Sequence, residues 1–188
     1  MLEDGAQLGV EASRQLAALG TVTMAPGLTD DELAHIEGEF GVEFADDHRA
    51  FLSAGLPVGD SWPDWRSGPR RGLHQRLQLP VEGILFAVEW REFWGGEWGV
   101  RPARMKDALR SAKYHLARSP QLVPVRSNHY LPAGRSRHGQ PVLSVYQADV
   151  GCCATDLFAY VEHEFAGVDA DPARRPASTV PFWSDLIR

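Results

Sequence analysis

The sequence predicts an α+β fold, a single domain in which a mainly antiparallel, twisted β-sheet is flanked by helices. Helical segments come first along the chain, a block of strand-like segments interrupted by one helix follows, and a helix closes the order. Strands and helices do not alternate regularly, which argues against a Rossmann-like fold. We find no internal repeat and no long linker, so residues 1–188 are expected to form one domain.

The N-terminal helices carry the clearest local signals. Residues 11–19 predict a short helix before a Met-Ala-Pro-Gly break. Thr29 and Glu32 match a capping box, so a second helix is expected to begin there and to stop at Gly41. Residues 45–55 predict a third helix, with acidic residues at the positive end of its dipole.

The later segments mix strands and helices. Residues 81–90 (VEGILFAVEW) predict a strand because they are apolar and β-branched, and an irregular aromatic segment follows them. A helix is expected to begin at Pro102 and to end before Pro120. Strands are expected at 121–134 and 140–150, joined by a turn that lets them pair antiparallel. A helix at 156–165 and a tail follow them. We expect the core to span about 28–165, with the helix at 11–19 and the tail at 166–188 packed on it; Phe182, Trp183 and Ile187 are expected to dock the tail.

Composition and charge narrow the function classes. The chain is 44% hydrophobic and 23% charged, as in ordinary globular proteins. Its formal net charge of -6 and unclustered basic residues argue against a nucleic-acid partner. No apolar run has the length of a signal peptide or a membrane span, so we expect a cytoplasmic protein without membrane insertion.

Motifs for catalysis and metal binding do not match this sequence. The glycines of GGEWG have the wrong spacing for a dinucleotide fingerprint, and neither a phosphate loop nor a G-x-S-x-G elbow occurs. His163 and Glu164 begin like a zincin motif, but Gly167 stands where the second His is needed. We therefore expect no catalytic residues, no metal and no cofactor.

The two cysteines, Cys152 and Cys153, are adjacent, which fits a reducing compartment better than a disulfide framework. A nucleophilic thiol needs a lowered pKa, which the helix expected to start near Asp156 could supply. We favour the other interpretation, that both side chains act as small buried hydrophobic groups at the end of a strand.

The stretch GLPVGDSWPDWR, residues 55–66, holds the first group of candidate partner-binding residues. The favoured interpretation is a lid folded over the core, with an arginine paired to a carboxylate or capping carbonyl groups. The alternative is direct contact with a partner. The candidates in this stretch are Trp62, Asp64, Trp65 and Arg66.

A second aromatic segment, residues 89–98, is too rich in tryptophan to be buried completely. Because Trp, Tyr and Arg dominate interface energetics, we expect part of it to line a cleft. An alternative is a sugar-binding cleft that uses Glu89, Glu92 and Glu97. The partner-binding candidates are Trp90, Trp94, Glu97 and Trp98, with Arg126, His129 and Tyr130 on the same rim.

Three motifs near the N-terminus carry a family resemblance. LTDDEL at 28–33, FGV at 40–42 and DHRAFL at 47–52 are similar to the opening helix pair of the Smi1/Knr4 family, also called the SUKH superfamily. The downstream segments GLPVGDSWPDWR, EGILFAVE, EFWGGEWGVRP, LVPVRSNHYLPA, QPVLSVYQADV and DLFAYVEHEF resemble a bacterial branch of it in the same order, up to about residue 165. Gly151-Cys152-Cys153 departs from the bulkier, more aromatic stretch expected there.

The resemblance implies an α+β fold with a mostly antiparallel sheet and brings no catalytic residue set. Many bacterial members resemble immunity proteins, which neutralise a cognate toxin of a polymorphic toxin system, whereas fungal relatives are interaction hubs in cell-wall signalling. We therefore expect a non-enzymatic protein-binding module of immunity type. The alternatives are a housekeeping interaction scaffold and a small-molecule or carbohydrate-active enzyme that uses residues 89–98.

Overall fold

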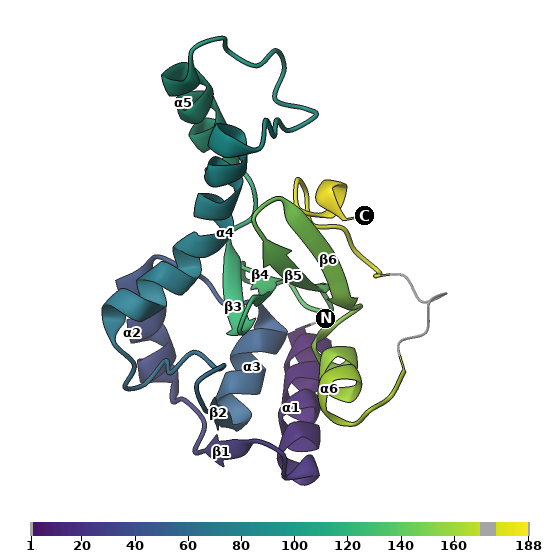
Figure 1. Ribbon diagram of the computed structural model, residues 1–188. Coiled ribbons are helices and arrows are strands. Elements are labelled where there is room, and N and C mark those ends of the chain that lie inside the picture. Colours follow the sequence, from purple (N-terminus) through teal and green to yellow (C-terminus); the bar gives the residue numbers. More distant parts are fainter. Residues whose placement is uncertain (1, 170–175, 188) are drawn as a thin grey trace.

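A four-stranded antiparallel sheet lies at the centre of the protein (Figure 1). The computed structural model describes residues 2–169 and 176–187. Within these residues, α-helices and a small two-stranded sheet surround the central sheet, which confirms the α+β class. The central strands are β3 (Leu122–Arg126), β4 (His129–Pro132), β5 (Val142–Tyr146) and β6 (Asp149–Ala154), in that order across the sheet.

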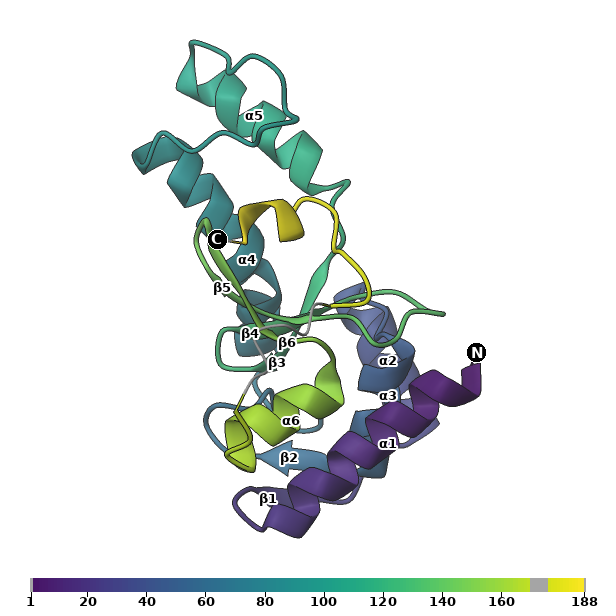
Figure 2. The same cartoon turned by 90° about the vertical axis from the view of Figure 1, so that its right-hand side faces the viewer.

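One face of the central sheet packs against helices from the N-terminal part of the chain and the late helix; in Figure 2, α1 and α6 lie below the sheet and α5 lies above it. Val123 and Leu131 point into this first core and are fully buried. The elements around it are α1 (Leu2–Leu19), α2 (Asp30–Phe40), α3 (Asp46–Ala54) and α6 (Leu157–Phe165), with the small sheet of β1 (Thr23–Ala25) and β2 (Leu56–Val58).

The opposite face packs against the second half of α4 (Arg70–Trp90), α5 (Met105–Leu116) and the C-terminal tail. Leu122 and Tyr130 point into this second core, because successive residues of a strand face opposite sides of a sheet. The tail, with the short 3-10 helix η1 (Ser184–Leu186), docks here through Trp183, which is buried and donates its indole N–H to the Pro120 carbonyl oxygen at 2.8 Å. Residues 170–175 and 188 of the expected tail lie outside the described residues.

Helix α1 begins at Leu2 and is longer than the helix predicted over residues 11–19. Its close packing on α3 depends on Gly9, since a Cβ at that position would lie 2.0 Å from the carbonyl oxygen of Asp47. A glycine costs about 1 kcal/mol of helix propensity relative to alanine. The glycine allows the two helix backbones to come into contact at this point.

The strand predicted over residues 81–90 is wrong, because these residues form the second half of α4. Pro80 lies inside this helix, where it cannot donate a hydrogen bond to the carbonyl oxygen of Arg76. The hydroxyl of Tyr130 donates to that oxygen instead, at 3.2 Å. A contact with a distant strand thus supplies the partner that the proline removes.

The two strands predicted over residues 121–134 and 140–150 are each divided by a tight turn. The first segment forms the β3–β4 hairpin, with Ser127 at a φ of 48° in its turn. The second begins the β5–β6 hairpin, with Gln147 at a φ of 56°. Strands β4 and β5 pair antiparallel, as predicted for the two segments.

The helix boundaries with local signals agree closely with the structure. The capping box of Thr29 and Glu32 is formed, and Gly41 ends α2 in the left-handed conformation. The predicted helix at 102–119 begins at Met105, and Asp156 caps α6 by accepting a hydrogen bond from the amide of Ala159. None of the helices in the described part of the chain combines the length and the apolar character that crossing a membrane requires.

Candidate functional site

Helices α4 and α5 form a hairpin that projects from the central sheet, and residues 91–104 form the loop at its far end (Figure 1). Ile84 of α4 and Ala112 of α5 are fully buried between the helices and the rest of the second core. Arg101 ties the loop back by donating to the carbonyl oxygen of Val88 at 2.8 Å. The aromatic segment is therefore held on a packed scaffold.

Trp98 is the centre of an aromatic stack in this loop and is only 8% exposed. Its ring lies nearly parallel to those of His115 and Phe182, with centroids 5.4 Å away in both cases. Trp94 meets it edge to face at 5.2 Å and donates its indole N–H to the carbonyl oxygen of Gly99. Such pairs contribute about 0.5–1.5 kcal/mol each beyond area burial. The stack thus joins the loop, α5 and the tail.

Phe182 has a φ of 69°, a left-handed conformation that is unfavourable for an aromatic residue. Its ring contacts Trp98 on one side and Trp183 edge to face at 5.0 Å. Backbone strain of this kind costs on the order of 1–3 kcal/mol and persists where packing enforces it. The two tryptophans supply that packing.

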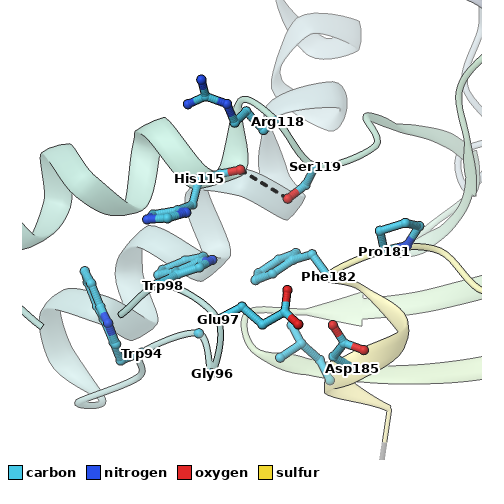
Figure 3. A pocket seen from close by; sticks show the side chains of 12 residues that line it. Trp94, Gly96, Glu97, Trp98, His115, Arg118, Ser119, Pro181, Phe182 and Asp185 are labelled. Atoms are coloured by element: carbon cyan, nitrogen blue, oxygen red, sulfur yellow. Dashed lines mark hydrogen bonds between the residues drawn. The ribbon is translucent and has the colours of Figure 1, made fainter. Parts of the chain in front are cut away.

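A cavity of about 430 Å³ opens beside the stack (Figure 3). This volume lies within the range of small-ligand sites. Its walls come from three segments that are far apart in sequence: the α4–α5 loop, the end of α5, and the tail. The lining residues are Trp94, Gly95, Gly96, Glu97, Trp98, His115, Arg118, Ser119, Pro181, Phe182, Asp185 and Leu186.

Two carboxylates, those of Glu97 and Asp185, point into the same space below the Phe182 ring (Figure 3). Neither makes a hydrogen bond or ion pair with another side chain among the described residues. The guanidinium of Arg118 lies 3.7 Å above the centre of the Tyr114 ring and points away from both acids in Figure 3. The described residues hold no group of three His, Cys, Asp or Glu side chains suited to a metal ion. The cavity therefore combines aromatic walls with two carboxylates that form no ion pair within the part of the chain that the structure describes.

The structure brings Trp94, Glu97 and Trp98 together, as the aromatic segment suggested, but places Trp90 elsewhere. Trp90 ends α4 outside the cavity lining and is 66% exposed. The other expected acids also lie outside, because Glu89 is on the exposed side of α4 and Glu92 is exposed just after it. A cleft built from all three glutamates is therefore not formed.

Trp62 and Trp65 form the lid that we favoured over partner contact, and both are buried in the first core. The Trp62 ring stacks on Phe51 and Phe165, with centroid distances of 6.5 and 5.8 Å. The prediction that these two tryptophans bind a partner is therefore wrong, because the lid leaves their rings almost no exposed surface.

Arg66 makes both kinds of contact that were predicted for it. Its Nε lies 2.6 Å from a carboxylate oxygen of Glu32, and its other nitrogens donate to the carbonyl oxygens of Pro26 and Gly27 at 2.9 Å. The hydrogen bond from Arg66 lowers the pKa of Glu32 to about 2. Asp64 accepts a hydrogen bond from the backbone amide three residues later, at 2.9 Å. These polar residues hold the lid in place.

Arg126, His129 and Tyr130 do not share the rim of this cavity. Tyr130 is buried in the second core, which raises the pKa of its hydroxyl to about 12. His129 points to the other face of the sheet, where its Nδ1 lies 2.6 Å from the Tyr160 hydroxyl oxygen, and Arg126 pairs with Glu164 at 3.1 Å. The grouping is wrong because neighbouring strand residues face opposite sides.

The cysteines lie within β6 and form no disulfide. Cys153 packs against the first core, but Cys152 is exposed, so the expectation of two buried side chains is wrong for Cys152. Burial raises the pKa of both thiols, which disfavours the thiolate form that a nucleophile needs.

Three cavity residues, His115, Arg118 and Asp185, were not among the sequence candidates. His115 lies in the last turn of α5, an ordinary amphipathic helix, and Arg118 stands two residues after its end, so neither belongs to a pattern that marks a site. The Phe-Trp pair at 182–183 was the available signal, because a tail that docks through these rings also carries Asp185 to the site.

Comparison of the chain with protein-family models, with curated proteins and with solved structures finds no match.

Proposed function

We propose that this protein is a non-enzymatic protein-binding module whose partner docks on the exposed side of α4. The observation that carries the proposal is a row of Leu79, Phe86 and Trp90, which are 46%, 42% and 66% exposed. Spacings of seven and four residues place all three on one side of a helix. We call this row the α4 stripe.

The α4 stripe differs from scattered apolar surface residues, which are ordinary in globular proteins. Gly83 lies on the same side of α4, and the backbone of Gln147 approaches it, so the β5–β6 turn borders the stripe. Tyr146, next to this turn, is also largely exposed. Aromatic side chains of this kind anchor protein interfaces because they bury large areas at a low cost in conformational entropy.

For the partner, we propose a toxin domain that this protein neutralises in the bacterial cytoplasm. Support comes from the resemblance of residues 28–165 to the bacterial branch of the Smi1/Knr4 family. The net charge of -6 is also complementary to a basic partner, and complementary charge speeds association. A housekeeping partner would use the same stripe.

Capture of partners from a lysate of the source cells, read by quantitative mass spectrometry, tests the stripe. A variant carrying Phe86→Ala and Trp90→Ala is compared with one carrying Val58→Ala and Val168→Ala, since both valines are exposed at 47% outside the stripe. We expect a stoichiometric partner with the wild type and the valine variant and its loss with the stripe variant. Retention by a folded stripe variant would show that the partner binds elsewhere.

Growth of cells that express the captured protein separates the two kinds of partner. A toxin arrests growth when it is expressed alone, and co-expression of the wild type restores growth while the stripe variant does not. A partner without toxicity identifies an interaction scaffold and refutes the immunity function.

A further inference from the structure

We propose that the cavity beside Trp98 binds an organic cation, an alkylammonium or alkylguanidinium group. The cation is either a Lys or Arg side chain of the docked partner, in which case the proposal rests on the proposed function, or a free small molecule. Both sources present the same chemistry to the cavity, and the experiment below distinguishes them.

The walls of the cavity suit the apolar and cationic parts of such a group. Trp94 and Phe182 line the cavity and are only partly buried, so part of each ring remains accessible there. Trp98 is held between His115 and Phe182, which fixes the geometry of the wall. Aromatic faces attract cations through the ring quadrupole, and they pack on an alkyl stem.

The acids of the cavity lack the arginine partners that other acids of this protein have. Glu37, for example, pairs with Arg49 and Arg135. Glu97 and Asp185 share a cavity and have no side-chain partner among the described residues. Two neighbouring carboxylates repel one another, and a cation between them relieves this repulsion.

The nearby basic side chains are directed to other contacts. Arg118 stacks on Tyr114, Arg101 donates to a backbone carbonyl, and His115 lies flat against Trp98. Arg118 lines the cavity with its charge intact, but it forms no ion pair with Glu97 or Asp185, and its guanidinium points away from both acids in Figure 3. A cationic ligand can pair with both carboxylates, whereas a neutral ligand would leave them without a paired charge.

Titration of the purified protein with ethylguanidinium chloride tests the site, with ethylurea as a neutral probe of the same shape. The indole N–H resonances of Trp94 and Trp98 report binding, which we expect at a Kd on the order of 1–10 mM and weaker at high salt. The double variant Glu97→Gln with Asp185→Asn should weaken binding at least about tenfold, because both charge contacts are lost. Glu89→Gln removes an exposed acid outside the cavity and should leave binding unchanged.

The captured partner identifies the source of the cation. If the double variant at Glu97 and Asp185 weakens partner binding, the cation is a partner side chain; if partner affinity is unchanged while ethylguanidinium still binds the wild type, it is a free molecule. The cation site would be overturned if ethylguanidinium did not bind the wild type, or if ethylurea bound it as tightly as ethylguanidinium. Loss of the partner from the Phe86 and Trp90 variant would even then leave the proposed function supported.

Discussion

Two buried titratable side chains at the start of α3, Asp47 and His48, have opposite effects on stability as the pH changes. Asp47 accepts hydrogen bonds from the amides of Gly139 and His48 at 2.8 Å, and burial raises its pKa from 3.8 to about 6. His48 is fully buried, its Nδ1 has no hydrogen-bond partner among the described residues, and burial lowers its pKa from 6.5 to about 3. Both side chains are therefore less favourable in the folded protein when they are charged.

The direction of each effect follows from which state binds more protons. Between pH 3.8 and 6 the folded state holds the Asp47 proton more tightly than the unfolded state, so the contribution of Asp47 to stability is lost as the pH rises. Between pH 6.5 and 3 the unfolded state holds the His48 proton more tightly, so the contribution of His48 is lost as the pH falls. From about pH 4 to 6 the two dependences nearly cancel.

We predict that removing either group exposes the pH dependence of the other. Asp47→Asn should lose about 2 kcal/mol of unfolding free energy between pH 6 and pH 4 relative to the wild type, because one pKa unit corresponds to about 1.4 kcal/mol. His48→Gln should gain about 2 kcal/mol over the same range. Urea unfolding followed by tryptophan fluorescence at pH 4, 5 and 6 measures both changes.

The readout is the change in unfolding free energy with pH. A hydrogen bond that a substitution removes at every pH shifts the whole profile equally and does not affect this slope. Glu89→Gln, an exposed change on α4, should keep the wild-type slope. Parallel pH profiles for Asp47→Asn, His48→Gln and the wild type would refute the shifted pKa values and the reasoning from burial.

Three further predictions concern one ion pair and two packing contacts. Arg66→Ala should lower the thermal midpoint, and the difference should shrink between pH 4.5 and about 2, because the lowered pKa of Glu32 stabilises the fold only while Glu32 is ionised; an unchanged difference at pH 2 would contradict this. Gly83→Ala should destabilise the protein by about 1–3 kcal/mol in urea unfolding, because its Cβ would lie 2.9 Å from Gln147 Cα; a neutral result would mean that the turn can move. Trp183→Ala should cost about 3–5 kcal/mol by the same assay, and a cost below 1 kcal/mol would show that the tail does not contribute to the second core.

Helices that begin or end at motifs of neighbouring residues could be predicted from the sequence, whereas α4 could not. The capping box at Thr29 and the glycine stop at Gly41 involve only neighbouring residues. In contrast, residues 81–90 form a short apolar run that periodicity alone cannot assign to a helix or a strand. Pro80 looks like a helix break, and the hydroxyl that satisfies the freed carbonyl comes from Tyr130, fifty positions later.

The candidate site shows the same division. Trp94, Glu97 and Trp98 could be identified because they are close in sequence, and their shared loop keeps them together. His115 and Asp185 reach the cavity only through the packing of α5 and the tail on the second core. The sequence therefore predicts the aromatic wall of the cavity but not the second carboxylate, that of Asp185.

Helix α4 links the proposed binding surface to the rest of the protein. Its first half buries Leu73 and Leu77 in the first core, and its second half buries Ile84 and Val88 in the second. A helix anchored in two cores presents its exposed side in a fixed orientation, so the α4 stripe is preorganised and a partner does not have to order it. Because the stripe lies on the side opposite these anchors, substitutions there can abolish partner binding while both cores remain packed.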